Sequence, residues 1–194
     1  MRVSSGGSLM RLATLLRSSL LAVTACGSSD SMGSSMSDAQ TPPTSGHADI
    51  EKWLGDAAYK TWACEPMVHA ARSPSPHGFN RICSNDAIAT AATGTAAWPK
   101  GAAAVKELYD SDTAAAPSGF AVYLKTDASS ADGANWYWYE RVAPSSGSNG
   151  VMADGRGTSG PPKSVCVGCH AGAGMDAAHT PSPGGRDLVY TPVH

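Results

Sequence analysis

The sequence has no apolar run of eighteen residues, so no segment has the length and composition of a membrane-spanning helix. Charged residues make up only 15% of the chain, and its Lys and Arg residues form no basic run or patch. That absence argues against a nucleic-acid partner. Gly and Pro are plentiful, at 21 and 13 residues, as is typical of an exported, loop-rich chain. The length of 194 residues predicts one folded domain with a sizeable core.

Residues 1–26 have the features of an export signal. Arginines at positions 2, 11 and 17 supply positive charge, and a short apolar stretch lies at residues 20–25. The tetrapeptide Val23-Thr24-Ala25-Cys26 resembles the lipobox of bacterial lipoproteins, in which the Cys is lipidated and becomes the mature N-terminus. This resemblance implies a periplasmic or cell-surface protein whose only membrane contact is a lipid on Cys26.

The polar segment 27–47 has no apolar period and predicts a flexible Ser/Gly/Pro linker, which leaves 48–194 as the folded domain. The apolar period that starts at Ile50 and includes Trp53 and Trp62 predicts a helix from about Asp49 to Glu65. A short helix is expected at 87–93.

Four strands are expected in the middle of the chain, at residues 78–84, 102–109, 120–125 and 135–142. They follow one another through turn-like links, so the sequence favours an antiparallel sheet. A long surface loop at 143–162, a helix at 163–170 and an extended segment at 188–191 complete the prediction. The expected fold class is α+β, mostly antiparallel β-sheet with a few short helices.

The stretch Cys166-Val167-Gly168-Cys169-His170 is the Cys-x-x-Cys-His sequence that attaches c-type haem. Each thiol forms a thioether with the haem rim, and His170 is the expected ligand of the iron. A zinc site would require a second Cys/His pair at similar spacing, and a thioredoxin-like dithiol would require a βαβ unit upstream. The sequence has neither, so we expect one covalent haem c on a helix near the C-terminus.

Only 24 residues follow His170, which limits the supply of a second axial ligand. Met175 is too near to reach the opposite face of a haem, and His179 or His194 would require the tail to wrap around it. We therefore expect an open iron site whose far wall comes from the upstream strands. The remaining thiols, Cys64 and Cys83, are expected to form a disulfide in an oxidising compartment.

Residues 98–108, which contain Val105-Lys106-Glu107-Leu108, resemble the G-x-x-x-V-K-E-L strand of the cytochrome P-460 family. Residues 120–125 and 135–139 resemble its next two strands, and the haem attachment sequence lies where that family places it. The resemblance covers about 78–190. It implies a mostly antiparallel β fold, often dimeric, with a five-coordinate haem bound by His170.

The family resemblance implies two chemistries. Cytochrome P-460 proper oxidises hydroxylamine and carries a lysine joined to the haem, and Lys106 stands at that position. The related cytochromes c′-beta bind nitric oxide or carbon monoxide without the crosslink, in which case Lys106 is an ordinary strand lysine. An electron-transfer module is the third alternative. Oxidation would also require a redox partner protein.

A proton-handling group is expected above the iron, and the candidates are Glu140, Arg81 and His77. Glu140 shares one face of its strand with Trp136 and Trp138, but the sequence does not say which face meets the haem. Asn80 and Arg81 compete for one place in the pocket, because a shift of one residue moves a side chain to the other face. Phe79 is a candidate cap over the iron, and His69 is a candidate distal contact.

Overall fold

The computed structural model describes residues 40–90, 96–129, 132–144, 148–175 and 185–190. The expected export signal 1–26 with Cys26, most of the linker, and the candidate ligands His179 and His194 lie outside these ranges. Among the first described residues, Pro42 is buried and the first helix starts at His47.

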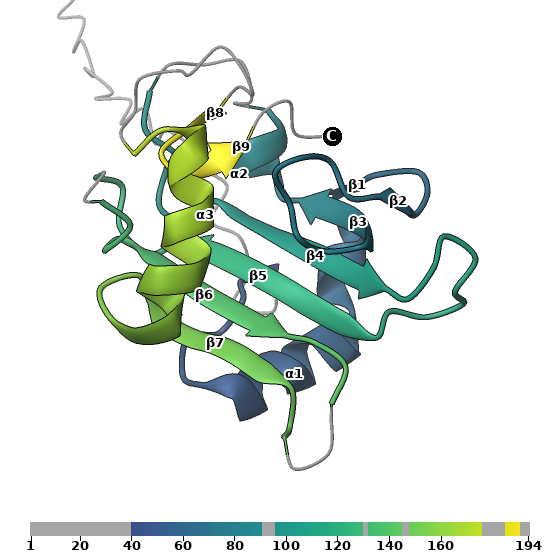
Figure 1. Cartoon of the computed structure of the whole chain (residues 1–194). Coiled ribbons are helices and arrows are strands. Elements are labelled where there is room, and N and C mark those ends of the chain that lie inside the picture. Colours follow the sequence, from purple (N-terminus) through teal and green to yellow (C-terminus); the bar gives the residue numbers. More distant parts are fainter. Residues whose placement is uncertain (1–39, 91–95, 130–131, 145–147, 176–184, 191–194) are drawn as a thin grey trace, which may run out of the picture. The chain divides into compact units, whose positions relative to one another are not determined.

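Within the described ranges, seven strands form one antiparallel sheet, which confirms the predicted α+β class (Figure 1). The strands lie in the order β1-β3-β4-β5-β6-β7, and β2 pairs with β3. Their bounds are β1 Ala63–Cys64, β2 His69–Ala70, β3 Phe79–Ser84, β4 Ala103–Tyr109, β5 Gly119–Lys125, β6 Trp136–Arg141 and β7 Val151–Arg156.

Short helices cover both faces of this sheet. Helix α1 (His47–Asp56) and the 3-10 turn η2 (Ala58–Thr61) lie on one face. The other face carries α2 (Asp86–Ala89), a C-terminal helical segment and the hairpin β8–β9. The segment runs through the π-helical η3, the short α3 and the 3-10 turn η4, with bounds Pro162–Val167, Gly168–His170 and Ala171–Ala173. The hairpin joins Gly185–Arg186 to Val189–Tyr190.

The alternation of side chains in β6 separates two hydrophobic clusters. Tyr137 and Tyr139 pack with Ile50, Trp53 and Leu54 of α1, which forms the first cluster. Trp136 and Trp138, which alternate with these tyrosines along β6, pack on the opposite face with Cys166, Val167 and Leu188. The Cys166–His170 stretch therefore lies over the face of the sheet that carries the tryptophans.

Two elements differ from the sequence prediction. The first helix ends at Asp56, because Gly55 and Asp56 are weak helix formers and Ala57 adopts a left-handed conformation with φ 56°. The predicted loop 143–162 contains β7, an edge strand in which only Ala153 is buried. Such a strand depends on main-chain hydrogen bonds to β6 and leaves little apolar pattern in the sequence.

Among the described residues, no helix combines the length and hydropathy that a bilayer crossing would need.

Candidate haem-binding site

A cavity of about 270 Å³ lies on the tryptophan face of the sheet. Strands β3 to β6 supply its floor, the helical segment supplies one wall, and the loop before β3 supplies another. The surface of the cavity is mostly apolar, with a few polar side chains directed into it. Its lining includes Glu65, Arg72, Ser75, His77, Asn80, Ile82, Ala104, Lys106, Tyr123, Trp138, Glu140, Val165, Cys166, Cys169, His170 and Tyr190.

The two cysteines of the attachment sequence lie together at the edge of this cavity. Neither forms a disulfide, and they are separated by three positions across the junction of η3 and α3. That spacing brings both side chains to the same side of a helical turn. Burial raises the pKa of Cys166 to about 12, so its thiol is protonated at neutral pH.

The imidazole of His170 is oriented by the main chain of the β8–β9 turn. Its Nδ1 atom lies 2.7 Å from the carbonyl oxygen of Leu188, and because a carbonyl only accepts, Nδ1 carries the proton and donates it. The other nitrogen, Nε2, is therefore the unprotonated atom of the neutral ring. Burial lowers the pKa of His170 to about 4, so the ring is neutral at pH 7.

Aromatic side chains surround His170. Its ring centroid lies 4.8 Å from that of Trp138 and 5.7 Å from those of Tyr123 and Tyr190. The indole Nε1 of Trp138 is buried without a hydrogen-bond partner in the described chain. The hydroxyl of Tyr190 donates to the carbonyl oxygen of Cys169 at 3.0 Å. The imidazole is thus held by packing on its sides and by a hydrogen bond at Nδ1.

Lys106 lies in the cavity and is directed away from the first hydrophobic cluster. In β4 it alternates with Val105 and Glu107, which face the other side of the sheet. Its Nζ atom is 3.4 Å from the hydroxyl of Ser75. Burial lowers the pKa of Lys106, and the nearby Cys169 and Glu140 oppose that shift. A buried amine with a lowered pKa is a better nucleophile than an exposed lysine.

Glu140 and His77 meet above the same cavity. Oε1 of Glu140 lies 3.7 Å from Nδ1 of His77. Burial raises the pKa of Glu140, while the positive charge of Lys106 lowers it. Burial and Lys106 together lower the pKa of His77 to about 4. The three side chains come from β6, β4 and the loop before β3, and all are able to exchange protons.

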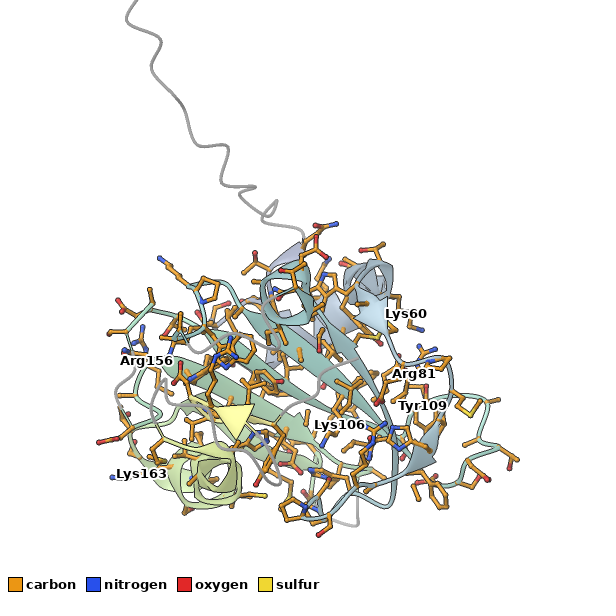
Figure 2. The ribbon with its side chains drawn as sticks, turned by 90° about the horizontal axis from the view of Figure 1, so that it is seen from above. Lys60, Arg81, Lys106, Tyr109, Arg156 and Lys163 are labelled. Atoms are coloured by element: carbon orange, nitrogen blue, oxygen red, sulfur yellow. A yellow bond between two sulfur atoms is a disulfide. The ribbon has the colours of Figure 1, made fainter. Side chains whose placement is uncertain are left out.

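Arg81 and Phe79 do not lie in this cavity, so the expectation that either contributes to it is corrected. Both side chains point to the opposite face of β3, where Arg81 Nε donates to Glu107 at 2.8 Å. Figure 2 shows Arg81 beside Tyr109, which also donates to Glu107. Asn80, the alternative at this place, lines the cavity. The register of β3 against β4 therefore determines that Asn80, and not Arg81, faces the cavity.

His69, the candidate distal contact, does not line the cavity either, because its imidazole contacts Glu65. Its Nε2 atom lies 2.9 Å from Glu65, which also accepts from Arg72 at 2.6 Å. Glu65 and Arg72 line the cavity but were missed in the sequence, because no local pattern distinguishes them from other loop residues. Tyr123 was missed too, although its alternation with Val122 places it on the same face as Trp138. The spare thiols Cys64 and Cys83 form a disulfide between β1 and β3.

The residues around the cavity fit a covalently attached haem. Two free thiols, an unprotonated imidazole nitrogen and a mostly apolar wall occur together. Among the described residues, no group of three or more His, Cys, Asp or Glu side chains is arranged to hold a bare metal ion.

The chain matches no family model, no curated protein and no solved structure in comparisons with known proteins.

Proposed function

We propose that this chain is an exported monohaem c-type cytochrome of the P-460 type, which binds hydroxylamine or nitric oxide at an open haem iron and oxidises it. The observation that carries the proposal is the convergence of Cys166, Cys169 and His170 on a cavity that also contains Lys106 and Glu140. Electron transfer alone would not require proton-exchanging side chains in the cavity.

The protein's own residues have distinct roles in this proposal. Cys166 and Cys169 hold the haem through two thioethers, and His170 presents Nε2 to the iron because Nδ1 is engaged by Leu188. Lys106 contacts the haem rim. The haem, when bound, supplies an iron that takes the nitrogen of the substrate and accepts its electrons.

Glu140 is the proposed proton acceptor. Oxidation of hydroxylamine releases protons together with electrons, so a group near the iron has to take them up. A buried carboxyl with a raised pKa accepts a proton more readily than an exposed one. His77, 3.7 Å away, has a pKa lowered to about 4 and therefore does not compete with Glu140 for that proton at neutral pH. The electrons leave through a redox partner protein.

The apolar part of the wall favours a second candidate function. Ile82, Ala104 and Trp138 line the cavity beside the polar groups, and an apolar surface suits a small diatomic ligand. In this alternative the chain binds nitric oxide or carbon monoxide without turnover, as a cytochrome c′-beta-like protein. In both cases Cys26 carries the lipid that anchors the protein in the periplasm or at the cell surface, and a homodimer is the proposed assembly.

Absorption spectra of the oxidised and reduced protein, produced in a host that matures c-type cytochromes, test the proposal. We expect covalent haem with an open coordination position, and consumption of hydroxylamine in the presence of an artificial electron acceptor. Tight nitric oxide binding without hydroxylamine turnover would select the second candidate. A six-coordinate low-spin spectrum would select electron transfer, and a colourless protein with both thiols free would overturn the proposal.

A further inference from the structure

The β8–β9 turn that orients His170 has an unfavourable backbone conformation. Asp187 and Leu188 both have positive φ, at 44° and 67°, and neither is glycine. Asp tolerates this left-handed region, but Leu enters it only at a conformational cost. Both main-chain groups of Leu188 are engaged: its N–H donates to Gly174 at 2.8 Å and its carbonyl accepts from His170. Interactions elsewhere in the fold must hold the turn in place.

A buried ion pair supplies that support. Nζ of Lys125 donates to Oδ2 of Asp187 at 2.5 Å, and the two residues are 1% and 0% exposed. The indole Nε1 of Trp136 donates to the other carboxylate oxygen at 3.3 Å. Nζ of Lys125 also lies 4.9 Å from the centre of the Trp136 ring. Asp187 is therefore held by adjacent strands in the interior of the sheet, β5 and β6.

This ion pair has no surface role, because neither charge reaches solvent. Burying two charges is costly, and an apolar pair of similar size often stabilises a protein at least as well. The ion pair instead fixes a position, because it connects Lys125 in the sheet to Asp187, the residue immediately before Leu188.

We propose that Lys125 and Trp136 are positioning residues for the haem ligand: through Asp187 they fix the Leu188 carbonyl, which in turn sets the proton and orientation of His170. The inference rests on the proposed function, since it assigns His170 to the iron. Donation from Nδ1 makes the imidazole a stronger electron donor at Nε2, which favours the oxidised iron. When the Leu188 carbonyl loses its fixed position, the reduction potential rises.

The principal test is the double variant Lys125→Met/Asp187→Asn. It removes both charges together, keeps a side chain that tolerates positive φ, and leaves an oxygen acceptor for Trp136. Trp136→Phe is a milder second variant, which removes only the indole donor. Glu51→Gln is the matched control, because it removes the carboxylate charge from the Arg141–Glu51 pair, whose atoms lie 2.7 Å apart on the other face of the sheet.

Two properties of the haem-loaded protein report on His170: the reduction potential and the iron–histidine stretching frequency in resonance Raman spectra. In the double variant we expect about a tenfold shift of the one-electron equilibrium towards the reduced form, about 59 mV upward, and a lower stretching frequency. Trp136→Phe should shift both properties in the same direction by a smaller amount, and Glu51→Gln should leave both unchanged.

A nitrogen-15 NMR measurement of His170 in the full chain without haem separates this inference from the proposed function. It reports whether the Nδ1 proton is hydrogen-bonded, whether or not haem attaches to the wild type. We expect a protected Nδ1 proton in the wild type and in Glu51→Gln, and a rapidly exchanging one in the double variant. If the double variant does not fold, Trp136→Phe decides the question. Unchanged potential, stretching frequency and proton exchange in the folded variants would overturn the inference.

Discussion

Arg81 donates a hydrogen bond to Glu107 on the face of the sheet opposite to Lys106. Because successive residues of a strand point to opposite faces, β4 supplies Lys106 to the cavity and Glu107 to a buried network behind it. Glu107 is fully buried and also accepts from Tyr59 at 2.6 Å and from Tyr109 at 2.8 Å. These contacts hold β3 and β4 in the register that directs Lys106 into the cavity lined by Cys166, Cys169 and His170.

The first prediction concerns stability at acid pH. Burial alone would raise the pKa of Glu107, but hydrogen bonds from Tyr59, Arg81 and Tyr109 outweigh it and lower the pKa below the ordinary 4.5. The carboxylate therefore stabilises the folded state fully above about pH 4.5, and this contribution is lost as the pH falls through the lowered folded-state value.

Glu107→Gln should reduce the free energy of unfolding at pH 7 by about 1.5–3 kcal/mol and weaken its dependence on pH below 5. Urea denaturation at several pH values measures both effects. Lys52→Gln is the control, since the Lys52–Asp56 pair is exposed and screened by solvent, so its removal should leave the stability unchanged. Equal pH dependence in the wild type and Glu107→Gln would contradict the assignment.

The second prediction concerns haem attachment. Cys166→Ala combined with Cys169→Ala should abolish covalent haem, because no thiol then remains at the cavity. Each single variant should retain one thioether. Mass spectrometry of the intact protein and a pyridine haemochrome spectrum distinguish these cases. Replacement of the disulfide pair Cys64 and Cys83 by Ser is the control, which should leave haem attached. Haem retained covalently in the double Ala variant would refute the assigned attachment site.

The third prediction concerns Lys106. Its half-buried position beside Cys169 leads us to expect a bond or close contact between its Nζ atom and the haem rim. Lys106→Arg should therefore change the absorption spectrum, and a haem-bearing peptide that contains Lys106 should disappear from proteolytic digests. Lys163→Arg is the matched control, because Lys163 is an exposed lysine on the attachment segment itself. An unaltered Lys106→Arg spectrum would remove Lys106 from the proposal.

The fourth prediction separates catalysis from binding. If Glu140 accepts the substrate proton, hydroxylamine oxidation should rise with pH as this carboxyl, whose pKa is raised by burial, becomes ionised. Glu140→Gln should lower turnover by about 10²–10⁴-fold, remove that rise and leave nitric oxide binding intact. Steady-state rates across pH measure the effect, with Glu51→Gln as the control. A Gln variant with the wild-type pH profile would assign the proton to another group.

Local patterns determined much of this protein. Apolar alternation located the four central strands of the sheet, and the split of Trp136 and Trp138 from Tyr137 and Tyr139 followed from the period of two alone. The Cys-x-x-Cys-His spacing was enough to predict a candidate site, because two thiols and an imidazole at these positions are the groups that attach and bind a c-type haem. A single strand, however, has two equivalent faces until another element covers one of them. Alternation therefore could not say whether Asn80 or Arg81 faces the cavity.

Only the tertiary structure decided which groups meet. The register of β3 against β4 turned Asn80 towards the cavity and Arg81 away from it. Contacts between residues far apart in the chain, from Lys125 to Asp187 and from His170 to Leu188, fixed the side of the imidazole that carries the proton. Such contacts leave no local signal, because they depend on where the sheet, helix and hairpin pack against one another. The sequence predicted the chemistry of Cys166, Cys169 and His170, and only the packing decided how these side chains are oriented.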